Sequence, residues 1–315
     1  MAAENDGGLL QYQLAGPETT AAQSGRRAMP TFRVMTYNIL FGGVGRESLI
    51  RDVVSAIDPD LVVFTEVTSA DSFEAIADVV GPHRAGHVRR SGREHPAIVS
   101  RWPIIQSGLL GPRWAPHKWV EATLQPFGGT RVNIVGVHLV PQPLWPFEIW
   151  RCAELRSLLT RLRTRAGTPQ VIAGDFNALS VGDPLRTEGA PGWVRAQWAL
   201  QGGWPRWALR TLTNAGYSDC YRACHEKEPG FTVPAWNPGV RIDYVFASAS
   251  LKMSLRGSGT PGSHTPAGAG APRRSLTELL GWKAVRFLGP EASDHLPVWA
   301  DFEWSSADDG QSRPS

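Results

Sequence analysis

The feature that most constrains this chain is a series of short apolar runs that each end in a polar residue. The runs VMTY, LVVFT, VNIVGV and VIAG are followed directly by Asn38, Glu66, His138 and Asp175. Runs of this length, rich in β-branched and aromatic residues, favour buried strands. One polar residue after a strand is typical of a solvated loop. Four such residues are a different case, because strand ends in a layered sheet gather at one edge, and the set therefore predicts a reaction centre there.

Further polar residues extend the same pattern. Asn177 lies two positions after Asp175, Asp243 lies inside RIDYVF, and Asp294 and His295 precede LPVWA. Carboxylates and amides with no pairing cysteines suit a hard cation such as Mg²⁺. Imidazoles and amides also suit an oxyanion. The combination points to chemistry on an anionic substrate.

The order of the apolar segments predicts the fold class. Several strands follow one another without a helix between them, which favours mixed sheets over a strictly alternating parallel one. We expect one domain over residues 30–304, preceded by a flexible segment 1–29 and followed by a polar tail 305–315. Residues 256–274 are rich in Gly, Pro, Ser and Ala and predict a loop inside the domain. The expected strands cover 32–40, 61–66, 97–100, 120–124, 131–139, 170–173, 241–246, 282–288 and 297–302, and the expected helices 48–57, 72–80, 148–165 and 206–215.

Composition narrows the setting. The net charge of +3 tolerates an anionic substrate without requiring one. The chain has three cysteines, which argues against a disulfide framework and for a reducing compartment. Cys220, Cys224 and His225 lack a fourth ligand for a structural metal site. No segment reaches the ~20 apolar residues of a membrane span, and no signal core precedes the first strand, so we expect a cytoplasmic protein, and a monomer.

The series TYNIL, FTEV, GVHLV, GDFNALS, RIDYVF and SDHLPV resembles the endonuclease/exonuclease/phosphatase superfamily, whose members include deoxyribonuclease I. These motifs occur in the family's order from about residue 36 to residue 299, and GDFN followed far downstream by SDH is the most specific pair. The resemblance implies an α+β fold, a four-layer α/β/β/α sandwich of two mixed, mostly antiparallel sheets with flanking helices. It also implies a magnesium-dependent hydrolase that acts on phosphoester bonds.

On the metal side, the resemblance assigns three residues. Glu66 matches the main ligand of Mg²⁺, Asn38 supports the metal site, and Asp294 matches a second carboxylate near the metal. Mn²⁺ is the alternative ion.

On the phosphate side, the resemblance assigns the remaining motif residues. Asp175 matches the group that orients or deprotonates the attacking water, and Asn177 the group that holds phosphate and nucleophile. His138 matches an imidazole on the leaving-group side. His295 matches the catalytic histidine at the phosphate, and Asp243 the acid that orients it. No Ser or Cys lies in a motif beside a base, so water is the expected nucleophile.

The substrate is less constrained by the sequence. Arg89, Arg90 and Arg93 fit either phosphate contacts or a solvated loop. Thr232, Trp236 and Arg241 fit either substrate contact or support of the site. Leu40 stands where the family's apurinic-site endonucleases usually carry a second acid, which argues against a dedicated role of that kind.

A tryptophan-rich stretch, residues 193–207, leaves three alternatives open: stacking on nucleic-acid bases, insertion into a lipid interface, or packing on the outside of the sandwich. The leading hypothesis is a phosphodiesterase on nucleic acid. The alternatives are the same chemistry on a small or lipid-linked phosphoester, as in phosphatases and sphingomyelinases, and a catalytically silent binding module.

Overall fold

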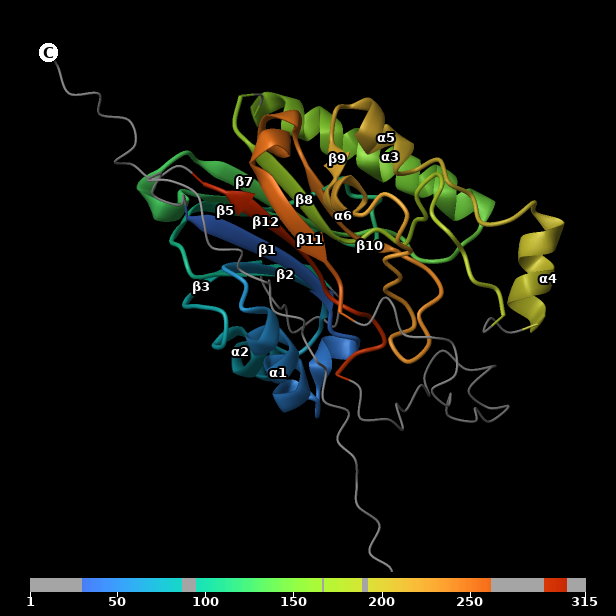
Figure 1. Ribbon diagram of the computed structural model, residues 1–315, viewed down its shortest axis with the longest axis horizontal. Coiled ribbons are helices and arrows are strands. Elements are labelled where there is room, and N and C mark those ends of the chain that lie inside the picture. The colour runs from blue at the N-terminus through green and yellow to red at the C-terminus, as the bar shows by residue number, and fades with distance from the viewer. Residues whose placement is uncertain (1–29, 87–94, 166, 189–191, 262–291, 305–315) are drawn as a thin grey trace, which may run out of the picture.

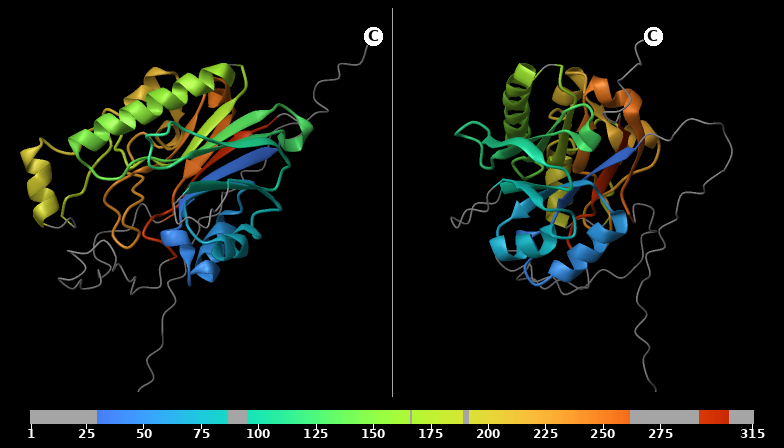
Figure 2. Two further views of the ribbon diagram at one scale, coloured as in Figure 1. Left: turned by 180° about the vertical axis from the view of Figure 1, so that it is seen from behind. Right: turned by 90° about the vertical axis from the view of Figure 1, so that its left-hand side faces the viewer.

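In the computed structural model of this protein, residues 30–86, 95–165, 167–188, 192–261 and 292–304 are described. They form two six-stranded sheets that pack face to face, with helices on both outer faces (Figures 1 and 2). This is the expected four-layer sandwich of mixed sheets. Among the described residues, no helix is long and apolar enough to cross a membrane.

The first sheet has the strand order β11-β12-β1-β2-β4-β3. β1 pairs parallel with β2 and antiparallel with β12, which comes from the other end of the chain. The bounds of its strands are β1 Thr31–Asn38, β2 Leu61–Val67, β3 His83–Ala85, β4 His95–Ser100, β11 Leu255–Gly259 and β12 Val298–Glu303.

The second sheet has the order β5-β6-β7-β8-β10-β9. β7 and β8 pair in parallel, and β10 runs antiparallel to β8. The bounds of its strands are β5 Ile104–Leu110, β6 Trp119–Leu124, β7 Val132–His138, β8 Gln170–Asp175, β9 Ser218–Asp219 and β10 Asp243–Ala247.

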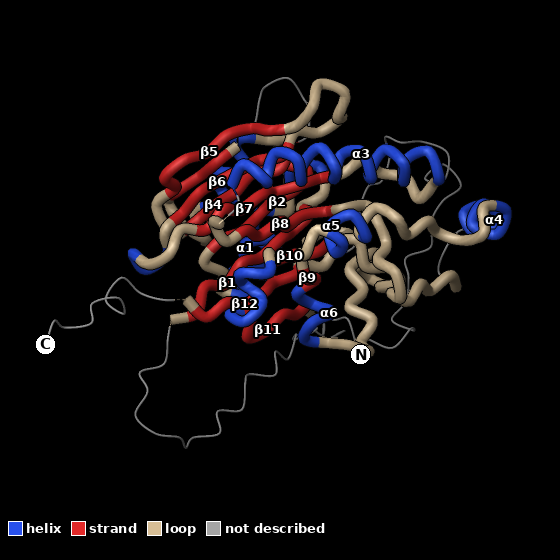
Figure 3. Tube along the Cα trace, turned by 90° about the horizontal axis from the view of Figure 1, so that it is seen from above, coloured by secondary structure: helices blue, strands red, loops and turns tan. Residues whose placement is uncertain are grey.

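Three apolar clusters hold the four layers together. One fills the space between the sheets and includes Phe32, Ile134 and Val245. A second packs helices α1 (Glu47–Ile57) and α2 (Ala70–Ala77) on the first sheet. A third packs α3 (Trp145–Leu162) on the second sheet, where α3 runs along the strands (Figure 3). The shorter helices are α4 Gly192–Leu200, α5 Arg210–Asn214 and α6 Cys220–Cys224.

Several sequence expectations need correction. Residues 255–259 form strand β11, although 256–274 was expected to be loop, because the edge of β12 offers backbone partners that compensate for the poor strand propensity of RGSG. The helix expected over 206–215 is formed only from Arg210 to Asn214. Strands β3, β5 and β9 had not been expected. Four segments with sequence predictions lie outside the described residues. They are the flexible segment 1–29, the loop residues 262–274, the strand 282–288 and the polar tail 305–315.

Candidate active site

The strand directions bring the polar residues to one end of the sandwich. Asn38, His138 and Asp175 end parallel strands, so they lie at the same end of their sheets. The antiparallel β10 starts at that end with Asp243, whose Cα pairs with that of Asp175. Asp294 and His295 stand just before β12, which also starts there. Because the two sheets pack face to face, the Asn38 amide of one sheet reaches the Asp175 carboxylate of the other.

The backbone around Asp175 explains the glycine and the asparagine of GDFN. Gly174 has φ 150°, and a Cβ placed there would lie 1.9 Å from the backbone oxygen of Val137. Only glycine therefore lets β8 run this close to β7. Asn177 has φ 48°, a left-handed conformation that asparagine tolerates. Its backbone N–H donates to Asp175 Oδ1 (2.8 Å) and its Nδ2 donates to the Leu139 oxygen (3.1 Å).

Asp175 is the centre of the cluster. Its Oδ2 accepts a hydrogen bond from Asn38 Nδ2 (3.1 Å). It lies 3.6 Å from His138 Nε2 and 3.9 Å from His295 Nε2. Burial, reinforced by the charge of Asp243, raises the pKa of Asp175 to about 8. A carboxylate in this setting has the proton affinity of a general base.

His295 is held by an acid from the other sheet. Its Nδ1 lies 2.8 Å from Asp243 Oδ2. Its backbone N–H donates to Ser293 Oγ (3.3 Å), and that hydroxyl donates to the backbone oxygen of Asn38 (2.7 Å). Burial alone would lower the pKa of His295, but the charges of Asp243 and Asp294 outweigh it and raise the pKa well above its ordinary value. The structure thus favours the charged imidazole.

His138 has the opposite electrostatics. Burial, then the charges of His117 and His295, holds its pKa well below the ordinary value. His117 stacks on it, with ring centroids 4.5 Å apart and planes 9° apart. His117 Nδ1 lies 3.1 Å from the backbone oxygen of His138. His117 was not predicted from the sequence, because it lies in the proline-bearing loop PRWAPHK before β6 and no periodicity or motif marks it.

Glu66 stands in a strained backbone position at a bulge of β2. Its φ is 61°, and the register of β2 on β4 shifts between Phe64 and Val67. Its Oε1 accepts from Asn38 Nδ2 (3.1 Å) and its Oε2 from the Phe41 N–H (2.8 Å). Strain of this kind persists where the surroundings fix it, and it is common at functional sites.

The donor set fits a divalent cation with oxygen ligands. Burial raises the pKa of Asp294, and the charge of the nearby Glu66 carboxylate raises that pKa further. Such crowding of acids is what a bound cation relieves. Asp175, Asp243 and His295 also offer ligand atoms within 4.8 Å of one another. Asp243 and His295 are hydrogen-bonded to each other, however, so Glu66 and Asp294 are also candidate metal ligands.

Asn38 supports these carboxylates through its nitrogen. Its Oδ1 accepts from the Leu40 N–H (2.9 Å), which fixes the orientation of the amide. Nδ2 therefore faces Glu66 and Asp175. The amide oxygen faces the Leu40 backbone, and the supporting role expected for Asn38 at a metal site stays a prediction.

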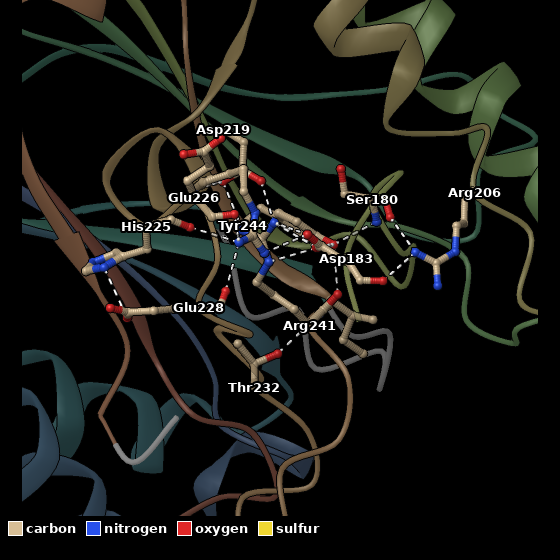
Figure 4. A network of polar contacts seen from close by, with 12 residues as sticks. Ser180, Asp183, Arg206, Asp219, His225, Glu226, Glu228, Thr232, Arg241 and Tyr244 are labelled. Carbon is tan, nitrogen blue, oxygen red and sulfur yellow. Dashed lines mark hydrogen bonds and ion pairs between the residues drawn. The ribbon is translucent and has the colours of Figure 1, made fainter. Parts of the chain in front are cut away.

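The segment 228–242 leads into Asp243, and two of its candidate residues, Thr232 and Arg241, are buried. Arg241 is buried and pairs with Asp183 (Nε to Oδ2, 2.9 Å) and Asp219 (Nη2 to Oδ2, 2.6 Å), as Figure 4 shows. Its guanidinium is 1% exposed and paired with two acids, which favours the support alternative. Thr232 is also buried: its Oγ1 accepts from the Ile242 N–H (3.2 Å).

The remaining sequence candidates divide into two groups. Trp236 is half-buried beside Ala235, whose N–H donates to the backbone oxygen of Asp294 (2.7 Å). Arg89, Arg90 and Arg93 lie outside the described residues.

Comparisons with known proteins agree with this arrangement. The model of the Endonuclease/Exonuclease/phosphatase family matches residues 35–295. A comparison with curated proteins finds no match. Three of the similar solved structures are a 3′ phosphatase from Neisseria bound to a product DNA hairpin, an AP endonuclease from Archaeoglobus fulgidus, and an endonuclease/exonuclease/phosphatase from Beutenbergia cavernae.

These likenesses cover most of the chain at low identity. The Neisseria structure has a TM-score of 0.59 at 21% identity and covers 87% of this chain and 100% of that one. The Archaeoglobus structure has 0.61 at 17%, with 86% and 99% covered. The Beutenbergia structure has 0.58 at 21%, with 89% and 73% covered. At such identities they establish the fold.

Proposed function

We propose that this chain, which belongs to the Endonuclease/Exonuclease/phosphatase family, hydrolyses phosphodiester bonds. The proposed nucleophile is water, and a divalent metal ion assists the reaction. The observation that carries the proposal is the position of Asp175. Its carboxylate lies between the Asn38 amide and the His295–Asp243 pair, with a pKa raised to about 8. A base and a cationic acid thus lie within 4 Å of each other at one anion-binding site.

Each side chain has a role in the reaction. Asp175 orients the water and accepts its proton as the new oxygen–phosphorus bond forms. The bond from phosphorus to the departing oxygen breaks in the same step, and the departing oxygen takes a proton from solvent. Charged His295, held by Asp243, donates from Nε2 to a phosphoryl oxygen, where negative charge builds in the transition state. His138 binds on the side of the departing oxygen, and Asn177 positions the phosphate.

Glu66 and Asp294 would hold the metal ion, and Asn38 would keep Glu66 oriented. When bound, the ion neutralises charge on the phosphoryl group. We propose Mg²⁺, with Mn²⁺ as the alternative, because the candidate ligands are all oxygen atoms.

Nucleic acid is the first candidate substrate, since two of the similar structures are a DNA-bound phosphatase and an AP endonuclease. A lipid-linked phosphodiester is the second, and exposed aromatic and aliphatic side chains on α3 and α4 favour it. The three cysteines within the described residues are unpaired, which fits the reducing cytoplasm that we propose as the location.

The test compares supercoiled plasmid with bis(4-nitrophenyl) phosphate, each in Mg²⁺, Mn²⁺ or chelator. Asp175→Asn removes the base, and Asp52→Asn, an exposed acid on α1, is the matched control. We expect hydrolysis of at least one substrate that requires metal and Asp175 and is unaffected at Asp52. Metal-independent turnover, or equal turnover by Asp175→Asn, contradicts the mechanism. Binding without turnover on either substrate, or on a monoester, supports the silent binding module instead.

A further inference from the structure

The outer face of α3 changes character along its length. At its N-terminal end Trp145, Ile149 and Trp150 are exposed by 47%, 58% and 37%. Towards its C-terminal end, Arg156 and Arg161 are exposed. The two glutamates of the helix, Glu148 and Glu154, are turned inwards and fully buried. The solvent side of α3 is therefore apolar at one end, basic at the other, and carries no exposed carboxylate.

Helix α4 extends the apolar end. Leu200 is 91% exposed and Trp193 is 59% exposed, while Trp198 is buried and packs on Trp204 with ring centroids 5.6 Å apart. α4 lies beyond the N-terminal end of α3 (Figures 1 and 3). The exposed side chains thus belong to a helix that is anchored by one buried tryptophan.

Specific contacts tie the two helices together. Trp145 Nε1 donates to the Gln201 oxygen (3.3 Å), and Gln201 Nε2 donates to the Pro143 oxygen (2.7 Å). The Trp145 ring meets that of Trp207 edge-on at 4.8 Å. An open, mainly apolar hollow of about 420 Å³ lies where the N-terminal end of α3 meets the C-terminal end of α4. It is lined by Leu144, Trp145, Pro146, Leu200 and Gln201. We call the exposed residues of α3 and α4 the α3–α4 face.

Exposed cations outnumber exposed acids around this face. Within the described part of residues 142–217, the exposed cations are Arg156, Arg161, Arg163, Arg186, Arg195 and Arg210. Among the acids of the same stretch only Glu188 is exposed, and it lies in the loop before α4. An anionic partner is therefore attracted without opposing carboxylates on the helices.

The side-chain types distinguish between anionic partners. Leu200 and Ile149 cannot stack on bases, yet they are among the most exposed apolar residues of the face. Tryptophan with aliphatic neighbours, flanked by arginine, is the composition of helices that lie in a membrane interface. Contiguous exposed apolar surface of this kind marks an interaction site.

We propose that the α3–α4 face docks on a membrane surface that contains anionic lipids. Trp193, Leu200 and Ile149 enter the interface, and the arginines of α3 and α4 contact the headgroups. α3 follows β7 by one short loop, and β7 ends at His138. Docking therefore holds the active-site end of the sandwich next to the lipid surface. This inference does not depend on the proposed hydrolysis.

The test measures co-sedimentation of the full chain with vesicles of phosphatidylcholine alone or mixed with phosphatidylserine. We expect binding to the mixed vesicles that weakens as salt is added. Trp193→Ser combined with Leu200→Ser should weaken it about tenfold or more. Met253→Ser, which changes an 82% exposed residue on another element, should leave it unchanged.

A charge variant separates the two contributions. Arg156→Ser should weaken binding to the mixed vesicles about fivefold and leave binding to phosphatidylcholine unaltered. Unchanged thermal unfolding of the variants shows that they are folded, and Asp175→Asn should bind vesicles like wild type even if the proposed hydrolysis fails. The proposal is overturned if wild type binds neither vesicle, if the Trp193/Leu200 variant binds like wild type, or if the face binds plasmid DNA and no vesicle.

Discussion

The carboxylate of Asp243 lies 2.8 Å from Nδ1 of His295, and the two residues come from opposite sheets. Asp243 begins β10, whereas His295 precedes β12. The pKa of His295 therefore depends on how the two sheets pack, because this packing brings the Asp243 carboxylate to the imidazole. We predict that Asp243→Asn lowers kcat by about 10²–10⁴-fold, the range that general acid–base assistance contributes.

The pH profile tests the same contact more directly. Asp243 raises the pKa of His295, so its removal lowers that pKa and the imidazole loses its proton at a lower pH. If charged His295 is the active form, the alkaline limb of kcat against pH moves towards lower pH in Asp243→Asn. An unmoved alkaline limb contradicts the role of His295 as the charged donor.

Much of the site could be predicted from the sequence because its residues end or begin strands with clear apolar patterns. Asn38, Glu66, His138 and Asp175 each follow such a run, and the structure gathers them at one end of the sandwich. His117 could not be found, because it acts through a ring stack and a contact with the His138 oxygen across 21 positions of sequence. Contacts of this kind depend on how loops fold back over the sheets.

The short and edge elements were also beyond sequence reasoning. β11 consists of LRGSG, which has little strand propensity, and it exists through its pairing with β12. The sequence left the role of Arg241 open between substrate contact and support, since its partners Asp183, in a loop, and Asp219, in β9, lie far from it in sequence. Local pattern predicts strands with strong propensity and leaves out those that tertiary pairing creates.

Asp175→Asn should have opposite effects on activity and stability. Burial raises the pKa of Asp175 in the folded protein to about 8, above its ordinary value of 3.8. Ionisation between those values therefore favours the unfolded chain, and stability falls as pH rises. In chelator at neutral pH, the Asn variant should melt at a higher temperature than wild type, and with metal added it should show no turnover. Equal or lower melting temperature contradicts the raised pKa.

His117 gives a graded prediction. His117→Ala removes both the stack on His138 and the contact with its backbone oxygen, and should lower kcat about tenfold. His117→Phe keeps a stacking ring and should lose less. His83→Ala, in the edge strand β3, is the matched control. Steady-state kinetics on the small diester distinguish the three, and a normal rate for His117→Ala contradicts a positioning role.

We predict that replacing Arg241 causes a large loss of stability. Its guanidinium is 1% exposed and joins two carboxylates, Asp183 and Asp219. Arg241→Met leaves both acids buried without this partner and should lower the free energy of unfolding by about 3–5 kcal/mol. Arg256→Met breaks an exposed ion pair with Glu303 and should cost about 1 kcal/mol or less. Urea unfolding measures both, and equal losses contradict the assignment of Arg241 as a buried anchor.

The burial of Glu154 on α3 should make the stability of the protein depend on pH, separately from the effect of the acids of the site. Burial raises its pKa from 4.5 to about 7, because Oε2 accepts only the Val140 N–H (3.2 Å) and Oε1 has no partner. The folded protein thus holds the proton more tightly than the unfolded chain. Stability from this residue is full below pH 4.5 and is lost as pH rises towards 7.

Glu154→Gln removes that loss, because a neutral amide carries no ionisation cost. Relative to the variant, wild type should become less stable between pH 5 and pH 8 by on the order of 2–3 kcal/mol. Denaturant unfolding at the two pH values measures the difference, and Glu188→Gln, an exposed acid, should show none. If wild type and Glu154→Gln instead keep a constant difference in stability across this range, Glu154 is already ionised at pH 5 and its buried oxygen has found a cation or water that offsets the burial.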